Sequence, residues 1–181
     1  AKIICISIAY FNKETTLHMR VKSVYGHGEK KILTDFLTTI NKIESLNSKW
    51  CFAGHNIKEF DIPFICRRLI INQVKIPAYL DFQNMKPWET NIVDTFQYWR
   101  FGDYKNYTSL KLLAAVMGIP SPKDDIDGSM VGELYWSETD REANLKRIAV
   151  YCQKDVITTG NIMLRFRNMP LVHPDNIKIV E

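Results

Sequence analysis

The sequence predicts an α/β domain with a mixed β-sheet. Short apolar runs of strand length alternate with segments in which apolar residues recur at every third or fourth position. Strands interleaved with helices in this way are typical of α/β architectures. The chain has 181 residues, the size of one domain, with 46% hydrophobic and 24% charged residues, as in an average globular protein. Length and composition therefore exclude a disordered tail, a collagenous chain and a disulfide scaffold.

Four strands are predicted from apolar runs. Residues 1–10 are almost continuously apolar, which is typical of a strand buried on both faces in the interior of a sheet. Apolar and polar residues alternate within 16–25, which predicts a half-exposed strand. Shorter strands are predicted at 49–53 and at 91–95, and the latter is expected to be the last strand of the chain.

Helices are predicted where apolar residues share one helical face. The spacing within 29–45 predicts an amphipathic helix. A second helix is expected at 62–72, with Asp61 as its N-cap. The rest of the chain is predicted to be helical, with a short helix at 109–117 and a long one at 142–166.

Charge and cysteine content narrow the function classes. A formal net charge of +4 permits a polyanionic partner without requiring one. No apolar run approaches the ~20 residues of a membrane span, and no secretory signal opens the chain, so a cytoplasmic protein without membrane contact is expected. Scattered histidines and the absence of a C-x-x-C pair exclude structural zinc. The four cysteines are expected to be buried, reduced thiols: Cys5, Cys51, Cys66 and Cys152.

The first group of candidate functional residues lies in the sequence G-H-N-I-K-E-F-D, residues 54–61. Here a predicted strand ends directly in a helix N-terminus, and sites of α/β sheets lie at the carboxyl ends of strands. Asn56, Phe60 and Asp61 therefore become candidates. The structural alternative is that Asp61 only caps the helix while Phe60 packs in the core.

The second group lies in the long helix. Tyr151 and Asp155 are four residues apart, so both side chains lie on one helix face. A carboxylate among apolar neighbours needs a partner, and a metal ion is one such partner. The alternative is an ion pair of Asp155 with Arg147 or Lys154 on a solvated face.

Together, N-x-x-x-F-D and Y-x-x-x-D resemble the second and third motifs of the DEDDy 3′–5′ exonucleases, members of the RNase H-like (DnaQ-like) superfamily. Further segments are similar to the branch related to the proofreading exonuclease domain of family B DNA polymerases: G-H-N-I-K-E-F-D-I-P-F, K-P-W-E, V-D-T, T-S-L-K-L-L, P-S-P-K-D-D-I-D-G-S and Y-C-Q-K-D-V. The resemblance extends from residue 3 to about residue 167. It implies an RNase H-like mixed β-sheet flanked by helices.

The resemblance also implies roles for individual residues. Asp155 is expected to bind a catalytic Mg²⁺ or Mn²⁺ directly, and Asp61 to hold the second metal largely through water. Tyr151 is expected to orient the attacking water, while Asn56 and Phe60 line the site near the 3′-terminal nucleotide of DNA, single-stranded or at a frayed end. Two such metals stabilise the attacking and leaving oxygens of an in-line displacement, and hard divalent cations prefer carboxylate oxygens.

One motif of the family is absent. Its D-x-E sequence supplies two of the four carboxylates from a strand that would precede residue 3, and no equivalent D-x-E occurs in the chain. We therefore expect the 181 residues to be N-terminally incomplete, to lack the first strand of the sheet and to be inactive as a nuclease. The rival hypothesis is a nucleic-acid-binding module with a decayed nuclease site.

An absent central strand has a structural consequence. Unpaired N–H and C=O groups are costly when buried, so an open edge beside residues 3–9 is expected to recruit another strand. A segment upstream of residue 1 or a second copy of the chain, giving a dimer by strand exchange, would supply it.

Two further features are left with open alternatives. Asp94, at the end of a predicted strand, either supports the site or makes a structural hydrogen bond. Aromatic residues lie near basic ones between residues 86 and 107, where they either pack or stack on bases. The residues concerned are Trp88, Trp99, Tyr104 and Tyr107, with Lys86, Arg100 and Lys105.

Overall fold

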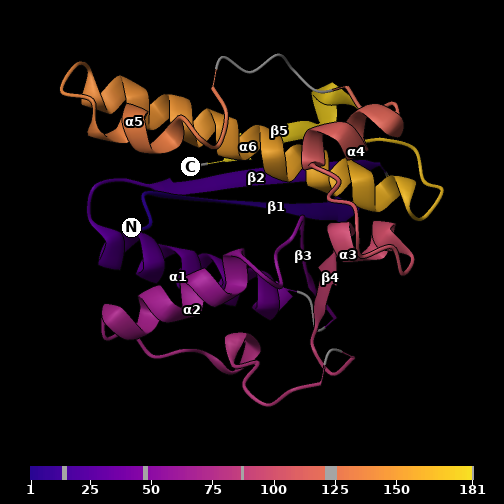
Figure 1. The fold of residues 1–181 in the computed structure, drawn as a ribbon, viewed down its shortest axis with the longest axis horizontal. Helices are drawn as coiled ribbons and strands as arrows, with labels where there is room; N and C mark the ends of the chain where they lie inside the picture. The colour runs from indigo at the N-terminus through magenta and orange to yellow at the C-terminus, as the bar shows by residue number, and fades with distance from the viewer. Residues whose placement is uncertain (14–15, 47–48, 87, 121–125, 181) are drawn as a thin grey trace. The chain divides into compact units, whose positions relative to one another are not determined.

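The computed structural model is a mixed α/β fold in which small sheets are flanked by helices, as expected for an RNase H-like fold (Figure 1). The structure describes residues 1–13, 16–46, 49–86, 88–120 and 126–180. The chain divides into two compact units, each built from two stretches of sequence. The first unit comprises Ala1–Ile3 with Gly28–Tyr107, and the second comprises Ile4–His27 with Thr108–Glu181.

The second unit contains a three-stranded mixed sheet. Strand β1 (Cys5–Lys13) is antiparallel to β2 (Leu17–Tyr25), and β2 is parallel to β5 (Ile177–Val180), so the order is β1-β2-β5. Met19 and Val21 of the central strand β2 are fully buried. The alternation predicted for this strand is therefore confirmed.

Among the described strands β1 has β2 as its one neighbour, so its other edge is open, as expected beside residues 3–9. One strand prediction is wrong. The strand at β4 (Ile92–Asp94) is not the last one, since β5 follows. β5 has only four residues, too few for alternation to distinguish it from a loop.

Helix α6 (Arg141–Arg165) covers one face of β1 and β2 in this unit (Figure 1). Two buried clusters hold it there, one around Met19 and Leu164 and one around Leu145 and Ile148. A Cβ at Gly160 would lie 2.7 Å from the Met19 side chain, so the absence of a side chain there permits the close approach of strand and helix. The predicted long helix is confirmed within one residue at each end.

Two shorter helices complete the second unit. Helix α4 (Leu110–Val116) matches the predicted short helix. Its N-cap is Ser109, whose Oγ accepts a hydrogen bond from Leu112 N at 3.2 Å. Helix α5 (Val131–Trp136) packs against α6 through Tyr135 and is missed by the sequence analysis. The 3₁₀ helix η2 (Pro174–Asn176) leads into β5.

The first unit pairs two short parallel strands, β3 (Phe52–Gly54) and β4. Helix α1 (Glu29–Leu46) buries the apolar face that its spacing predicts, and α2 (Asp61–Ile71) packs beside it (Figure 1). Both predicted helices are thus confirmed. Helix α3 (Thr95–Arg100), which follows β4 directly, and the 3₁₀ helix η1 (Ala78–Leu80) were not predicted.

A buried carboxylate ties three segments of the first unit together. Glu29, the first residue of α1, is 9% exposed. Its carboxylate accepts hydrogen bonds from Ile3 N at 2.6 Å, Arg68 Nε at 2.7 Å and Asn72 Nδ2 at 2.9 Å. Burial by itself raises the pKa of Glu29, but the hydrogen bonds from Arg68, Ile3 and Asn72 outweigh it and lower the pKa to about 2.

This shift predicts a pH-dependent contribution to stability. A carboxyl whose folded-state pKa is depressed stabilises the fold above its unfolded pKa of about 4.3, and the contribution is lost as pH falls towards the folded value of about 2. We expect Glu29→Gln to lower the free energy of unfolding by on the order of 3 kcal/mol at pH 7. Urea unfolding at several pH values measures the difference, and a gap that stays constant from pH 6 to pH 2.5 would contradict it.

Candidate active site

The first candidate residues lie on the segment that joins β3 to α2. β3 ends at Gly54, and a Cβ at this position would lie 2.5 Å from Cβ of Ile57, so the turn admits no larger residue. Asn56 has φ of +59°, in the left-handed region that asparagine tolerates better than most residues. Hydrogen bonds of 3.0 Å from Phe60 N to Asn56 O and from Ile62 N to Ile57 O lead the turn into α2. The segment is therefore a compact turn that ends at the helix start.

Asp94 holds this turn in place from the neighbouring strand. β3 and β4 are parallel, so their carboxyl ends meet at one edge, and Asp94 ends β4 there with 3% exposure. Its Oδ1 accepts from Asn56 N at 2.9 Å and Phe96 N at 3.0 Å, and more weakly from Gln97 N at 3.4 Å. Its Oδ2 accepts from Lys58 N at 3.0 Å. Both carboxylate oxygens thus bind backbone amides, and Asp94 positions the turn while capping α3.

Asn56 carries an unsatisfied polar atom within this turn. Its Oδ1 is buried and has no hydrogen-bond partner among the described residues. The neighbouring polar groups pair with one another, since His55 Nδ1 lies 3.0 Å from Thr95 Oγ1, which donates to Gly54 O at 3.2 Å. Buried oxygens without a partner are rare in native proteins and need an explanation. A ligand that supplies a hydrogen-bond donor or a cation to Asn56 Oδ1 is one such explanation.

Phe60 and Asp61 stand at the start of α2. Phe60 is 64% exposed and stacks on Phe64 at a centroid distance of 6.1 Å, so the alternative that Phe60 packs in the core is wrong. The expectation that Asp61 is the N-cap is also wrong: Phe60 occupies the cap position, because the preceding turn already has helical backbone geometry, and Asp61 is the first residue of α2. An exposed carboxylate in the first turn is stabilised by the helix dipole. Asp61 therefore does not cap α2.

Tyr151 and Asp155 lie on α6, in the second unit, one helical turn apart and half-buried. A Cβ at Gly128 would lie 3.7 Å from the Tyr151 hydroxyl, so this hydroxyl lies beside the backbone that leads towards α5. Arg147, one of the ion-pair partners considered for Asp155, donates from Nη1 to Asn144 Oδ1 at 3.2 Å. The two candidate side chains thus share one face of a packed helix.

The structure groups the candidates by unit. Asn56, Phe60, Asp61 and Asp94 meet where β3 and β4 end, and Tyr151 and Asp155 meet on α6. Within the described ranges, no group of three or more His, Cys, Asp or Glu side chains is arranged to hold a metal ion. Among these same residues, no helix is long and apolar enough to cross a membrane.

The cysteines differ from expectation at one position. Cys51 is exposed, because it precedes the short strand β3, whereas Cys5, Cys66 and Cys152 are half-buried and all four are free thiols. A side-chain hydrogen bond with Cys152 lowers the pKa of the Cys5 thiol against the opposing effect of burial. Burial raises the pKa of the Cys66 thiol.

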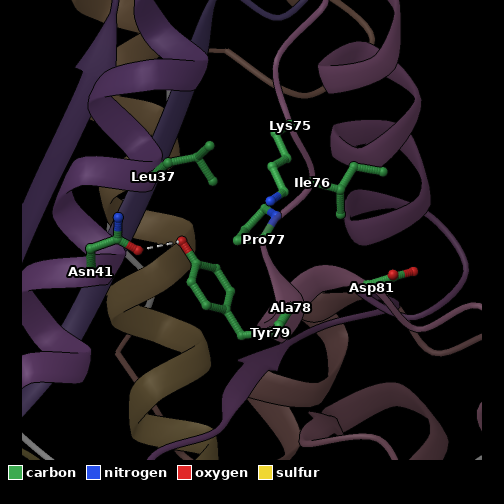
Figure 2. Close-up of a pocket in the computed structure, with 8 residues that line it drawn as sticks. All are labelled: Leu37, Asn41, Lys75, Ile76, Pro77, Ala78, Tyr79 and Asp81. Atoms are coloured by element: carbon green, nitrogen blue, oxygen red, sulfur yellow. Dashed lines mark hydrogen bonds between the residues drawn. The ribbon is translucent and has the colours of Figure 1, made fainter.

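A separate pocket of about 540 Å³ lies in the first unit between α1 and the segment that contains η1 (Figure 2). Tyr79 spans it and donates from its hydroxyl to Asn41 Oδ1 at 2.9 Å (Figure 2). Burial and the Glu44 carboxylate raise the pKa of Tyr79 to about 12. None of the candidate residues lines this pocket, and its charged side chains, Lys75 and Asp81, do not form a paired-acid site.

Sequence reasoning identified Asp94 and gave a structural hydrogen bond as one of its two possible roles, which the four bonds to backbone amides confirm. An Asp at the end of a strand and directly before a helix is an N-cap signal, and the sequence V-D-T-F contains it. The left-handed conformation of Asn56 has a weaker signal, the tolerance of asparagine for positive φ, which the H-N-I sequence does not single out.

Comparison with known proteins identifies one family. The family model described as a predicted 3′-5′ exonuclease related to the exonuclease domain of PolB matches residues 1–172. No curated protein matches the chain. The match includes every candidate residue in both units, from Asn56 to Asp155.

Proposed function

The chain belongs to the family of predicted 3′-5′ exonucleases related to the exonuclease domain of PolB, and on this premise we propose that it is a metal-dependent exonuclease acting on DNA 3′ ends. The observation that carries the proposal is the turn after β3. It combines an exposed carboxylate at Asp61 with an amide oxygen of Asn56 that is buried and has no partner among the described residues. Asp94 binds the backbone of this turn at Asn56 and Lys58. Such a turn is built to receive a ligand.

Each unit offers oxygen ligands of the types that Mg²⁺ and Mn²⁺ prefer. The first unit has the Asp61 carboxylate and the Asn56 amide oxygen, and the second has the Asp155 carboxylate. When bound, such ions stabilise the charge that develops on the oxygens of a phosphodiester during hydrolysis. Asp155 would hold the metal directly, and Asp61 would hold a second one largely through water.

The other candidate residues act on water and substrate. The Tyr151 hydroxyl accepts or donates a hydrogen bond and so holds the attacking water in line with the phosphorus atom. The exposed ring of Phe60 offers a face on which the 3′-terminal base stacks. Asn56 then contacts the same nucleotide or the metal through Oδ1. Cleavage leaves the shortened strand with its 3′ hydroxyl and releases a nucleoside monophosphate.

We further propose that two more carboxylates, those of the family's first motif, complete the site. Asp61 and Asp155 are half of the four acidic ligands that the resemblance implies. Two carboxylates without the one that bridges both metals should hold Mg²⁺ weakly, so the 181-residue form is expected to be inactive. Asp94 does not replace the missing group, because backbone amides occupy both of its oxygens.

The test compares two forms of the protein on a 5′-labelled single strand with Mg²⁺ or Mn²⁺. One form is the 181-residue chain, and the other is extended upstream in its natural reading frame to include a D-x-E motif. A ladder that shortens from the 3′ end is expected with the extended form alone. Failure of the extended form to cleave, with its fold intact by circular dichroism, would overturn the proposal.

The rival function is a nucleic-acid-binding module with a decayed nuclease site. The observation in its favour is that the described residues contain no group of three metal-ligating side chains. It predicts binding of the labelled strand without shortening by either form. Reading the codons upstream of Ala1 separates the two functions further, because a decayed site has no need of an in-frame D-x-E.

Tyr151→Phe in the extended form tests the role of the hydroxyl. The ring remains packed on α6 while the group that positions water is lost, and both acidic ligands remain. We expect a rate decrease of ~10²-fold, at the lower end of the range for positioning and acid–base groups. Single-turnover measurement isolates the chemical step, and an unchanged rate would remove Tyr151 from the mechanism.

A further inference from the structure

A run of exposed aromatic side chains follows β4 in the first unit. We call Tyr98, Phe101, Tyr104 and Tyr107 the α3 surface. Their exposed fractions are 51%, 83%, 79% and 66%. Single exposed apolar residues are common, but several exposed aromatic rings within ten residues of chain are typical of a binding surface. The mechanism proposed above makes no use of these four rings.

Contacts between the side chains join the four rings in two sets. The rings of Tyr98 and Phe101 lie 6.0 Å apart, and Tyr107 packs on the buried ring of Phe96 at 4.9 Å. The Arg100 guanidinium lies 4.0 Å from the Phe96 centroid and 5.6 Å from that of Tyr104. Tyr104 and Tyr107 are therefore linked through a buried ring and a cation, and Tyr98 and Phe101 form a second pair on the same short segment.

The backbone holds this arrangement at an energetic cost. Phe101 has φ of +44°, which is unfavourable for a bulky residue, and it is the most exposed of the four rings. The loop after it is fixed by Asp103, whose carboxylate accepts from Lys105 N and Asn106 Nδ2, both at 3.0 Å. Strained conformations that persist under such fixation cluster at functional sites.

The guanidinium of Arg100 has one nitrogen atom without a hydrogen-bond partner among the described residues. Arg100 Nε is buried and bonds to no acceptor among the described residues. Lys105 supplies a second positive charge on the same loop. A ligand that fits this chemistry has flat apolar faces, hydrogen-bond acceptors and negative charge. Single-stranded nucleic acid has all three, because its bases are unstacked and its phosphates carry the charge.

The α3 surface also connects to the turn after β3. Asp94 caps α3 and at the same time binds the backbone of Asn56 and Lys58. Gln97 Nε2 of α3 donates to Oε1 of Glu59 at 3.4 Å, and Glu59 directly precedes Phe60 in the sequence. A strand lying on the α3 surface can therefore continue to the exposed ring of Phe60.

We propose that the α3 surface binds single-stranded nucleic acid by stacking bases on Phe101 and Tyr104, with Arg100 contacting the backbone between them. The direction of the strand towards Phe60 rests on the proposed function. Binding of the strand to the α3 surface does not rest on the proposed function, because binding requires neither metal nor cleavage.

The test measures binding of a fluorescein-labelled oligo-dT strand to the 181-residue chain by anisotropy in EDTA, where no cleavage occurs. Loss of one base–aromatic stack weakens affinity roughly 5- to 150-fold, which is the expected effect of Phe101→Ala and of Tyr104→Ala. Trp136→Ala is the matched control, since Trp136 is a 68% exposed ring with Arg141 nearby, 5.9 Å from its centroid, in the second unit. Its affinity is expected to stay within twofold.

Conservative variants separate stacking from other uses of the surface. Tyr104→Phe keeps the ring and should bind like the wild type, whereas Phe101→Leu keeps apolar volume and should bind like Phe101→Ala. Equal binding of the strand by Phe101→Leu and the wild type would overturn the proposal. The α3 surface would then be assigned to a protein partner or to a second copy of the chain, and sedimentation would reveal self-association. A wild-type chain that binds no strand, beside an extended form that cleaves, would overturn this inference alone and leave the proposed function standing.

Discussion

Asp155→Ala is expected to remove nearly all nuclease activity from the extended form of the protein. The change deletes the carboxylate on α6 that we propose as a direct metal ligand. The fold should persist, because Asp155 is half-buried and the apolar clusters that hold α6 are untouched. Degradation of a 5′-labelled strand under single-turnover conditions measures the loss, and a rate near that of the wild type would refute the metal-site assignment.

The matched control is Asp175→Ala, which removes an exposed carboxylate from η2 in the same unit. It should leave the rate within twofold, so that a general effect of charge is distinguished from the loss of a ligand. Asp61→Ala, from the other unit, should behave as Asp155→Ala does. Retained activity in Asp61→Ala would refute the metal-site assignment as retained activity in Asp155→Ala would.

The sequence predicts the long helices of this fold better than its short elements. α1 and α6 span enough turns for apolar spacing to be unambiguous, and their ends agree with prediction within one residue. α3, α5 and β5 have four to six residues each, too few for a period to emerge. Their formation depends on contacts elsewhere in the chain, as when Tyr135 of α5 packs against Leu145 and Ile148 of α6.

The same contrast holds for the candidate site. The sequence identified the candidate residues because the motifs that contain them are local in sequence and resemble those of the family. They are Asn56, Phe60, Asp61, Tyr151 and Asp155. The hydrogen bond from Asn56 N to Asp94, 38 residues away, could not be predicted from a local motif, and neither could the burial of Asn56 Oδ1 without a partner among the described residues. The open edge of β1, by contrast, was expected, because the family's first motif lies on a strand that the 181 residues do not include.

Asp94→Ala is expected to destabilise the first unit and to disorder the turn after β3 together. The carboxylate is 3% exposed and serves four backbone N–H groups, those of Asn56, Lys58, Phe96 and Gln97. Each buried donor left without an acceptor costs about 1–3 kcal/mol, and water entering the space recovers part of this. A decrease of about 3–5 kcal/mol in the free energy of unfolding follows, measurable by urea denaturation of the 181-residue chain.

Two comparisons give this prediction its specificity. Asp103→Ala also removes a carboxylate that accepts from one backbone amide and one side chain. Because Asp103 lies on an exposed loop where water replaces these bonds, the change should lower the free energy of unfolding far less than Asp94→Ala does. Asp94→Asn keeps the three bonds to Oδ1 and replaces the acceptor for Lys58 N by a donor, so its stability should lie between those of wild type and Asp94→Ala. Activity of the extended form should follow the same order, because Asp94 acts by holding Asn56 and the start of α2. An Asp94→Asn variant of full stability without nuclease activity would instead make Asp94 a metal ligand and overturn its assignment as a positioning residue.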